Sequence, residues 1–290
     1  MTRIDAHHHL WKLDAVSYPW LEAQGVDRFF GNPTPIQRDF LLDELRSLGG
    51  PHNVTGSVHI QVGAADNFAE ASYIDGVANA SPDWHMVQVA AADLEAEDAL
   101  LQIERLKGLS SVRGVRQIIG RAPKEDAASG THNLLRNPAF KEGLAALSQH
   151  QLSFDLQLIP DVMEEAGQLF ASLPELPVVL CHGGSPYDRS AAGLAQWADA
   201  LKHLSALDHI YVKFSGLGMF EHDWTPDSLC PILSELWNQF GAERIMFGSN
   251  FPVCSLSSSY ADLVALYEAF IPASAQDGFF GKTARAFYRF

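Results

Sequence analysis

Two histidines near the start of the sequence have the spacing of a metal-binding or carbonyl-binding pair. His7 and His9 lie in the segment IDAHHHLW, which has the apolar pattern of a strand. Because strand side chains alternate between two faces, we expect both imidazoles on one face and His8 on the other. Two imidazoles on one face hold a metal ion or polarise a carbonyl. The alternative, a chance run or a tag remnant, does not explain its place inside a strand pattern.

A third histidine and an asparagine follow later apolar runs. His182 comes after VVLC and before two glycines, which let backbone approach a ligand closely; a core histidine is the alternative. Asn250 lies in GSNFP, after the run that ends at Phe247. Its amide donates and accepts hydrogen bonds but is no base, and a turn role is the alternative. We predict His7, His9, His182 and Asn250 as catalytic residues.

Further polar residues at the ends of apolar runs are candidates for substrate binding. Arg116 ends VRGVR, and its guanidinium suits a carboxylate or a pair of sugar oxygens, although a rim salt bridge is the alternative. His59 and Gln61 share a strand face whose direction depends on register. Lys213 suits a structural ion pair as well as contact with a ligand. Asp155 lines either the floor beneath the active site or the active site itself.

A long segment between the first strand and the first helix has an unusual number of aromatic residues. It runs from about Leu10 to Arg38 and includes Trp20 within YPWL. Such a segment is too aromatic for a flexible linker, so we expect a lid or pocket wall. Trp20 is therefore a candidate for stacking on a ring or a sugar face.

Positioning these side chains requires alternating strands and helices. Apolar, β-branched runs predict eight strands, at Arg3–His7, Val54–Gln61, His85–Ala92, Val112–Ile118, Leu152–Leu158, Pro177–Cys181, His209–Phe214 and Glu243–Phe247. Helical periodicity occurs between and after them, at Leu41–Leu48, Phe68–Ala80, Ala96–Leu106, Phe140–His150, Val162–Leu173, Leu194–Leu207, Leu229–Phe240 and Tyr260–Ile271. We predict an α/β fold, a (β/α)8 TIM barrel, over an open doubly wound sheet, because no Gly-rich dinucleotide turn follows the first strand.

Length and charge narrow the function classes. The 290 residues fit a single barrel domain, residues 1–290. The formal net charge of −15 disfavours nucleic acid as a partner, although a local basic pocket could hold a small anion. The three cysteines are far apart, which predicts neither a disulfide framework nor a zinc knuckle. With no apolar signal core and no apolar run of ~18 residues, we expect a cytoplasmic protein that does not bind membranes.

Taken in order, these motifs resemble the amidohydrolase-related family of TIM-barrel hydrolases. The resemblance covers essentially the whole chain and rests on IDAHHHLW, YPWL, RDF, GVR, LCHGG, KFSGL and MFGSNFPV. It implies an activity on lactones of sugar acids, as with fuconolactone or rhamnonolactone, or on lactones from aromatic breakdown. Related branches include decarboxylases.

The resemblance also implies roles for the histidines and reveals one departure. His7 and His9 match the first-strand His-x-His pair, and His182 matches the later histidine. Asn250 stands where the family has an aspartate that deprotonates the attacking water. One divalent metal, zinc or manganese, is implied on His7, His9 and His182; the metal-independent alternative stays open, because some lactonases of the family work without metal.

From these observations we expect a hydrolase that opens a lactone of carbohydrate metabolism. His7 and His9 polarise the carbonyl, Arg116 holds a hydroxyl or carboxylate, and His182 or a metal activates water. Asn250 orients the water or stabilises the oxyanion. The alternatives are a decarboxylase or lyase, a hydrolase of amides or phosphoesters, and a metabolite-binding member altered at Asn250. The expected partner is a small molecule, and a homodimer stays open.

Overall fold

Eight parallel strands form the centre of the molecule in the computed structural model, which describes residues 2–290. They neighbour one another in chain order from β1 to β8. Their bounds are β1 Arg3–His8, β2 Val54–Ile60, β3 His85–Ala90, β4 Val112–Val115, β5 Ser153–Leu156, β6 Val178–Leu180, β7 Ile210–Phe214 and β8 Ile245–Phe247. The α/β barrel predicted from the sequence is therefore present.

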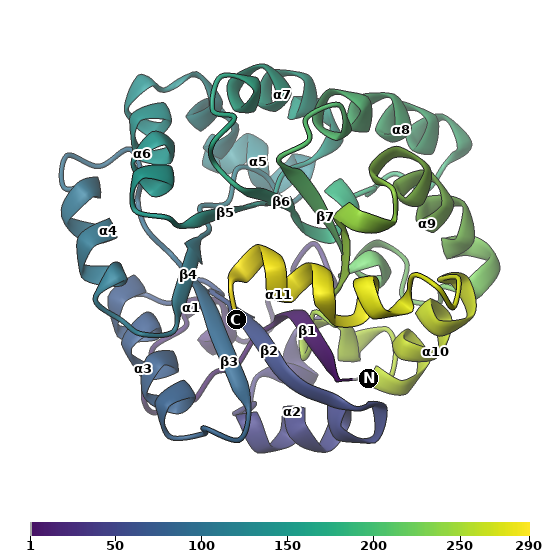
Figure 1. Cartoon of the computed structure of the whole chain (residues 1–290), viewed down its shortest axis with the longest axis horizontal. Helices are drawn as coiled ribbons and strands as arrows, with labels where there is room; N and C mark the ends of the chain where they lie inside the picture. The colour runs from purple at the N-terminus through teal and green to yellow at the C-terminus, as the bar shows by residue number, and fades with distance from the viewer. Residues whose placement is uncertain (1) are drawn as a thin grey trace.

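Helices surround the strands on the outside (Figure 1). Their bounds are α1 Pro19–Glu22, α2 Leu42–Gly49, α3 Asn67–Asn79, α4 Ala99–Lys107, α5 Pro123–Ser129, α6 Pro138–Gln149, α7 Met163–Ala171, α8 Ala191–Ser205, α9 Pro226–Phe240, α10 Tyr260–Phe270 and α11 Thr283–Tyr288. Short sequence signals set several starts: the Thr225 side chain accepts a hydrogen bond from Ser228 N–H before α9, and Ser259 does the same with Asp262 before α10.

The barrel closes where the chain leaving β8 meets β1. Asn250 N–H donates to the His7 carbonyl at 2.6 Å, and His9 N–H donates to the Phe251 carbonyl at 2.8 Å. Inside this seam the Asp5 carboxylate accepts backbone N–H groups of Ser249 and His7 at 2.9 and 3.2 Å. Closure thus places the GSN segment directly against the histidines of β1.

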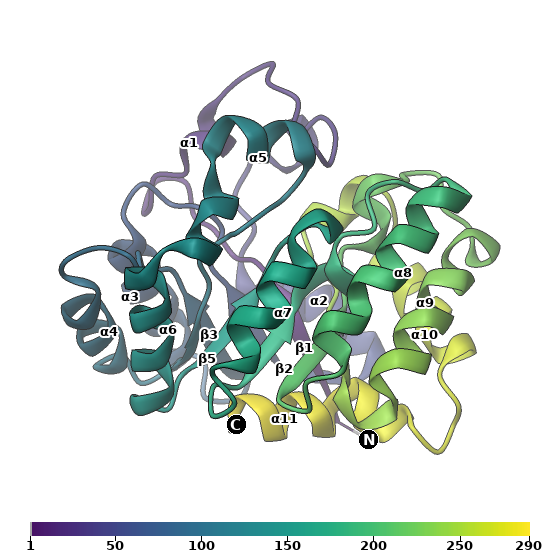
Figure 2. The same cartoon turned by 90° about the horizontal axis from the view of Figure 1, so that it is seen from above.

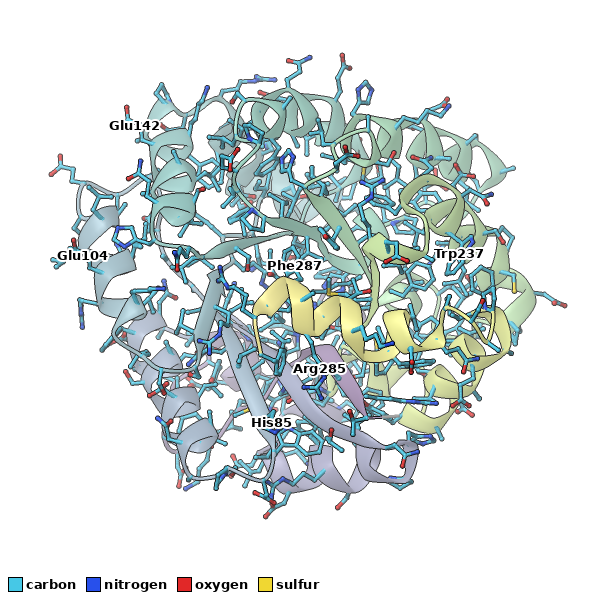
Figure 3. All side chains as sticks on the ribbon, in the orientation of Figure 1. His85, Glu104, Glu142, Trp237, Arg285 and Phe287 are labelled. Atoms are coloured by element: carbon cyan, nitrogen blue, oxygen red, sulfur yellow. The ribbon has the colours of Figure 1, made fainter. Side chains whose placement is uncertain are left out.

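The C-terminal helix α11 closes the end of the barrel opposite α1 and α5 (Figure 2). Phe287 and Tyr288 of α11 pack with Ile4, Val58 and other inward side chains of the strands. The Phe287 ring lies 5.0 Å from that of Tyr211, and Figure 3 labels Phe287 near the centre of the view along the barrel. A larger apolar layer fills the space between the strands and the outer helices. With one end filled by side chains, only the other mouth is open to a ligand.

The differences from the predicted elements are at the strand ends. The fourth strand was predicted to reach Ile118, but β4 ends at Val115, and the chain from Arg116 onward turns into the mouth. The helices α1, α5 and α11 were not predicted, since each is seven residues or shorter and has little periodicity to detect. Among residues 2–290, no helix combines the length and apolarity needed to span a membrane.

Candidate active site

A cavity of about 240 Å³ opens at the carboxyl ends of the strands. Its polar lining includes His9, Arg116, Gln157, His182 and Asn250. The aromatic lining comprises Trp20, Phe29 and Phe30 from the segment between β1 and α2, and Arg28 and Arg121 also line it. None of the described residues that line it is Asp or Glu. This mouth is where barrel enzymes carry their active sites.

The predicted histidines come together at this mouth. The His7 ring centroid lies 4.6 Å from that of His182 and 5.2 Å from that of His9. His7 is fully buried and does not line the cavity, whereas His9 and His182 do. Ile4 and Ala6 point into the barrel, so strict alternation would turn His7 outward; the register irregularity between Asp5 and His8 re-aims it inward.

Hydrogen bonds fix the tautomer of His9. Its Nδ1 lies 2.7 Å from the Ile60 carbonyl, which can only accept, so Nδ1 carries the proton. The Nε2 atom of the neutral ring is then an acceptor, and it faces a second acceptor, Asn250 Oδ1, at 3.2 Å, while Asn250 Nδ2 lies 3.3 Å from Met219 Sδ and 3.4 Å from Cys254 Sγ. This favours the amide orientation in which Nδ2 faces the ring. His9 and Asn250 therefore hold each other in the cavity wall.

Backbone geometry and a serine hold His182. Its φ of 55° and ψ of 33° lie in the left-handed region, which is uncommon for a residue with a Cβ and often marks a functional constraint. Its Nδ1 lies 3.1 Å from Ser215 Oγ. A Cβ on Gly216 would lie 2.5 Å from that Nδ1, so only glycine fits beside the ring. With Nδ1 turned to Ser215, Nε2 is left for a ligand.

All three imidazoles are neutral at neutral pH. Burial lowers the pKa of His182 to about 3, and the positive charges of Arg116 and Lys213 add to this effect. Burial also lowers the pKa of His7 and His9 well below the usual range, with Lys213 the next cause for His7 and Arg116 for His9. Neutral rings can accept a proton or a metal ion.

Arg116 is held at the base of the cavity with one donor free. Its Nη1 donates to Gln157 Oε1 at 2.9 Å, its Nη2 donates to the Gln61 carbonyl, and the residue is 3% exposed. Its Nε is buried and has no partner among residues 2–290. An oriented guanidinium at this place puts a fixed positive charge beside a ligand in the cavity.

Four predicted substrate-binding residues lie outside the cavity lining. His59 accepts the Leu10 N–H at 3.1 Å, and Gln61 accepts the Gly63 N–H at 2.9 Å, so both support loops. Lys213 and Asp155 form a fully buried ion pair of 2.6 Å. These side chains lie behind the residues of the cavity wall. Their direct contact with a substrate stays a prediction that the geometry does not support.

The residues around His7 fit a metal ion. Both His7 ring nitrogens are buried and lack a partner in the described chain, and imidazole is a common zinc ligand. Ligand atoms of His7, Asp155 and Cys181 lie within 4.8 Å of one another. Lys213 already pairs with Asp155, and burial raises the pKa of the Cys181 thiol to about 12, so these two are poorer ligands than the histidines.

Sequence reasoning missed the arginines at the rim. Arg28 lies in the predicted aromatic segment and Arg121 follows β4, and neither ends an apolar run. Phe29 and Phe30 were noted as part of a lid, which agrees with their place in the wall. The only local signal was a basic residue within or beside an otherwise apolar loop.

Comparisons with known proteins agree with this architecture. A family model described as "Amidohydrolase" matches residues 4–290. An uncharacterized protein, y4mH, of Sinorhizobium fredii is 32% identical over 99% of this chain and 98% of its own length. An L-fucono-1,5-lactonase of Burkholderia multivorans is 28% identical over 99% of this chain and 95% of its own.

Solved structures show the same fold. An amidohydrolase of Burkholderia multivorans with bound zinc has a TM-score of 0.84 at 25% identity, covering 100% of this chain and 99% of its own. A 2,6-dihydroxybenzoate decarboxylase from Rhizobium, at 15% identity and a TM-score of 0.65, shares only the fold; it covers 100% of this chain and 99% of its own. The barrel therefore supports more than one reaction among these proteins.

Proposed function

Because this chain belongs to the amidohydrolase family and is a hydrolase, we propose that it opens a lactone ring by attack of water at the mouth of the barrel. The observation that supports this most is the convergence of His182, Asn250 and Arg116 on one cavity, with neutral imidazole beside oriented donors. The lactonase named above, which is similar over nearly the whole chain, supports the same reaction class.

The lactone carbonyl is polarised by donors already in place. Arg116 and Asn250 both line the cavity, and the positive charge of the guanidinium and the amide dipole can stabilise the oxygen that becomes negative when water attacks. His9 holds the amide through its Nε2 atom, 3.2 Å away. In this mechanism Asn250 acts as a donor and does not replace the aspartate as a base.

His182 takes the proton of the attacking water at Nε2. Its low pKa disfavours the imidazolium in the empty cavity, but the developing oxyanion places a negative charge nearby and favours it. The carbon–oxygen bond of the ring then breaks, and the imidazolium returns the proton to the leaving alkoxide. The product is a hydroxy acid.

A divalent metal ion, zinc or manganese, would be held by His7, whose ring nitrogens have no partner among the described residues. His9 and His182 would hold it only in place of the His9–Asn250 contact and of proton transfer at His182 Nε2. When bound, such an ion supplies Lewis-acid polarisation of the carbonyl.

The test is hydrolysis of a lactone panel followed with a pH indicator, with and without added zinc or manganese. Replacing His182 with Ala should lower kcat by about 10²-fold or more, the range of general acid–base catalysis. Arg136→Gln is the control, because Arg136 is exposed and pairs only with Glu165, outside the cavity. Full turnover in H182A would remove His182 from the mechanism.

A decarboxylase is the second candidate, because Asn250 removes the carboxylate base expected for hydrolysis and a decarboxylase shares the fold. Release of carbon dioxide from hydroxybenzoates, without turnover of any lactone, would favour it over the hydrolysis proposed here.

A further inference from the structure

Two arginines stand at the rim of the cavity on separate loops. Arg28 lies between β1 and α2, and Arg121 lies between β4 and α5, 93 residues after Arg28. Arg28 Nη2 reaches Glu125 of α5 at 3.6 Å, which joins the two loops. Figure 2 shows the result: α1 and α5 project together beyond the strand ends. The two loops carry both guanidinium groups to one side of the mouth.

Arg121 makes no side-chain ion pair with another described residue, although Glu125 and Asp126 lie near enough to favour its charge. In the described part of the chain no carboxylate or carbonyl accepts a hydrogen bond from its guanidinium, which lines the cavity. The nearest acid along the chain, Asp126, accepts the Arg121 backbone N–H at 2.8 and 3.1 Å instead. Burial lowers the pKa of Arg121, and Arg116 lowers it next. The positive charge of Arg116 therefore disfavours the charged form of Arg121, and the carboxylate of Glu125 offsets this in part.

Arg116 adds a third positive group to the same cavity. It is almost fully buried, and its Nε donor has no partner among residues 2–290. Its other donors contact the neutral oxygens of Gln157 and Gln61. The carboxylates of Asp155 and Glu70 favour its charge without a hydrogen bond to it. Buried charges are normally paired, and the whole chain carries a net charge of −15, so acidic residues are plentiful elsewhere. Their exclusion from the lining leaves room for an anion supplied by the ligand.

We propose that the substrate carries a carboxylate in addition to the reacting carbonyl, and that Arg121, with Arg28, binds this carboxylate at the rim. This rests on the proposed function for the reacting carbonyl, which Arg116 faces at the base. The planar guanidinium of Arg121 offers paired donors to a carboxylate, as an ammonium does not. Trp20, Phe29 and Phe30 form apolar walls between rim and base, which suit the ring of a lactone.

This substrate class differs from a neutral sugar lactone. A ligand with only hydroxyl groups would leave Arg121 and Arg116 without a direct ion-pair partner in the cavity. A lactone carboxylate neutralises part of their positive charge and displaces no existing ion pair of Arg121. The selectivity therefore comes from the rim, while the reaction occurs at the histidines.

Binding of an unreactive probe tests the site without turnover. Titration calorimetry with glutarate, compared with its uncharged diamide, should show binding of glutarate that weakens about tenfold or more in Arg121→Gln. Arg28→Gln should weaken it less, because Glu125 already pairs with Arg28. Arg136→Gln should change nothing. Equal affinity for glutarate and the diamide, or no loss in R121Q while its thermal unfolding stays normal, would overturn the inference.

A kinetic arm separates this inference from the lactonase proposal. The carboxylate of γ-butyrolactone and its primary amide are compared as substrates; the wild type should prefer the carboxylate in kcat/KM, and R121Q should lose about tenfold or more of that preference. Turnover of both without preference would overturn the carboxylate site and leave the lactonase standing. Glutarate binding that depends on Arg121, with no lactone turned over, would leave the carboxylate site standing without the lactonase.

Discussion

The floor and the mouth of the barrel both hold charged groups, but the fully buried ion pair lies in the floor. In the floor, Lys213 Nζ lies 2.6 Å from Asp155, and the Tyr288 hydroxyl donates to the same carboxylate at 2.9 and 3.0 Å. At the mouth, Arg116 and Arg121 line a cavity with no acidic residue among its described lining. The floor pairs one cation with one anion, whereas the cavity lining has arginines and, among its described residues, no acid.

The difference separates a structural role from a ligand-binding one. A buried ion pair whose polar atoms are hydrogen-bonded needs no ligand. Removing either partner leaves a buried unpaired charge, which destabilises the fold. A buried cation with unused donors is satisfied only by something the chain does not contain. Residue type alone does not distinguish the two, because both regions present charged side chains from strand ends.

The largest expected effect is on the floor. Lys213→Met leaves Asp155 buried without its cation, and the free energy of unfolding should fall by about 3–5 kcal/mol in urea titrations. The double variant Lys213→Met/Asp155→Asn removes the stranded charge and should recover part of that loss. A single variant no less stable than the double one would mean that this pair is not the internally neutral unit described here.

At the mouth, Asn250→Asp should lower kcat/KM for a lactone by about 10²-fold, because a carboxylate cannot donate to the oxyanion. The stability of the variant should change little by comparison with the floor variant. Steady-state kinetics on the best substrate of the panel measure this. Faster turnover in N250D would instead show that hydrolysis is more efficient with a carboxylate base at this position.

Asp5 tests a third arrangement, a buried carboxyl that has neutral donors but no cation. Burial raises the pKa of Asp5 well above the ordinary range of an aspartate, to about 6. The folded protein therefore retains a proton that the unfolded chain loses, so this group's contribution to stability falls as pH rises from about 4 to about 6. The stability of Asp5→Asn relative to wild type should rise by about 2–3 kcal/mol between pH 4 and pH 7. A constant difference across that range would exclude the raised pKa.

The smallest expected effect is at the link between floor and C-terminal helix. Tyr288→Phe removes one hydrogen bond to Asp155, and stability should fall by about 1–2 kcal/mol. Glutarate affinity should stay the same, since Tyr288 does not line the cavity. Thermal unfolding gives the stability, and calorimetry on the same sample gives the affinity for glutarate. A loss of affinity that accompanies the loss of stability would show that the floor and the mouth are coupled.

Much of the fold could be predicted because its signals are local. Eight apolar runs separated by helical periodicity indicated the barrel, and the His7–His9 spacing and the glycines after His182 indicated the mouth. The rim could not be predicted in this way. Arg28 and Arg121 line the same cavity because two irregular loops fold over the same edge of the barrel. Irregular loops have no periodic pattern from which such an arrangement could be predicted.

By itself, the sequence indicated which apolar runs form the strands, and hence that polar residues near their carboxyl ends, His9, His182, Asn250 and Arg116, lie at one mouth, since parallel strands share a direction. Only the tertiary structure decided how the charges are paired. Lys213 and Asp155 belong to β7 and β5, and Tyr288 comes from α11; their contact depends on barrel register and on a helix docked across the far end. Pairing is a matter of distances of a few ångströms between segments far apart in sequence, which local propensities do not encode.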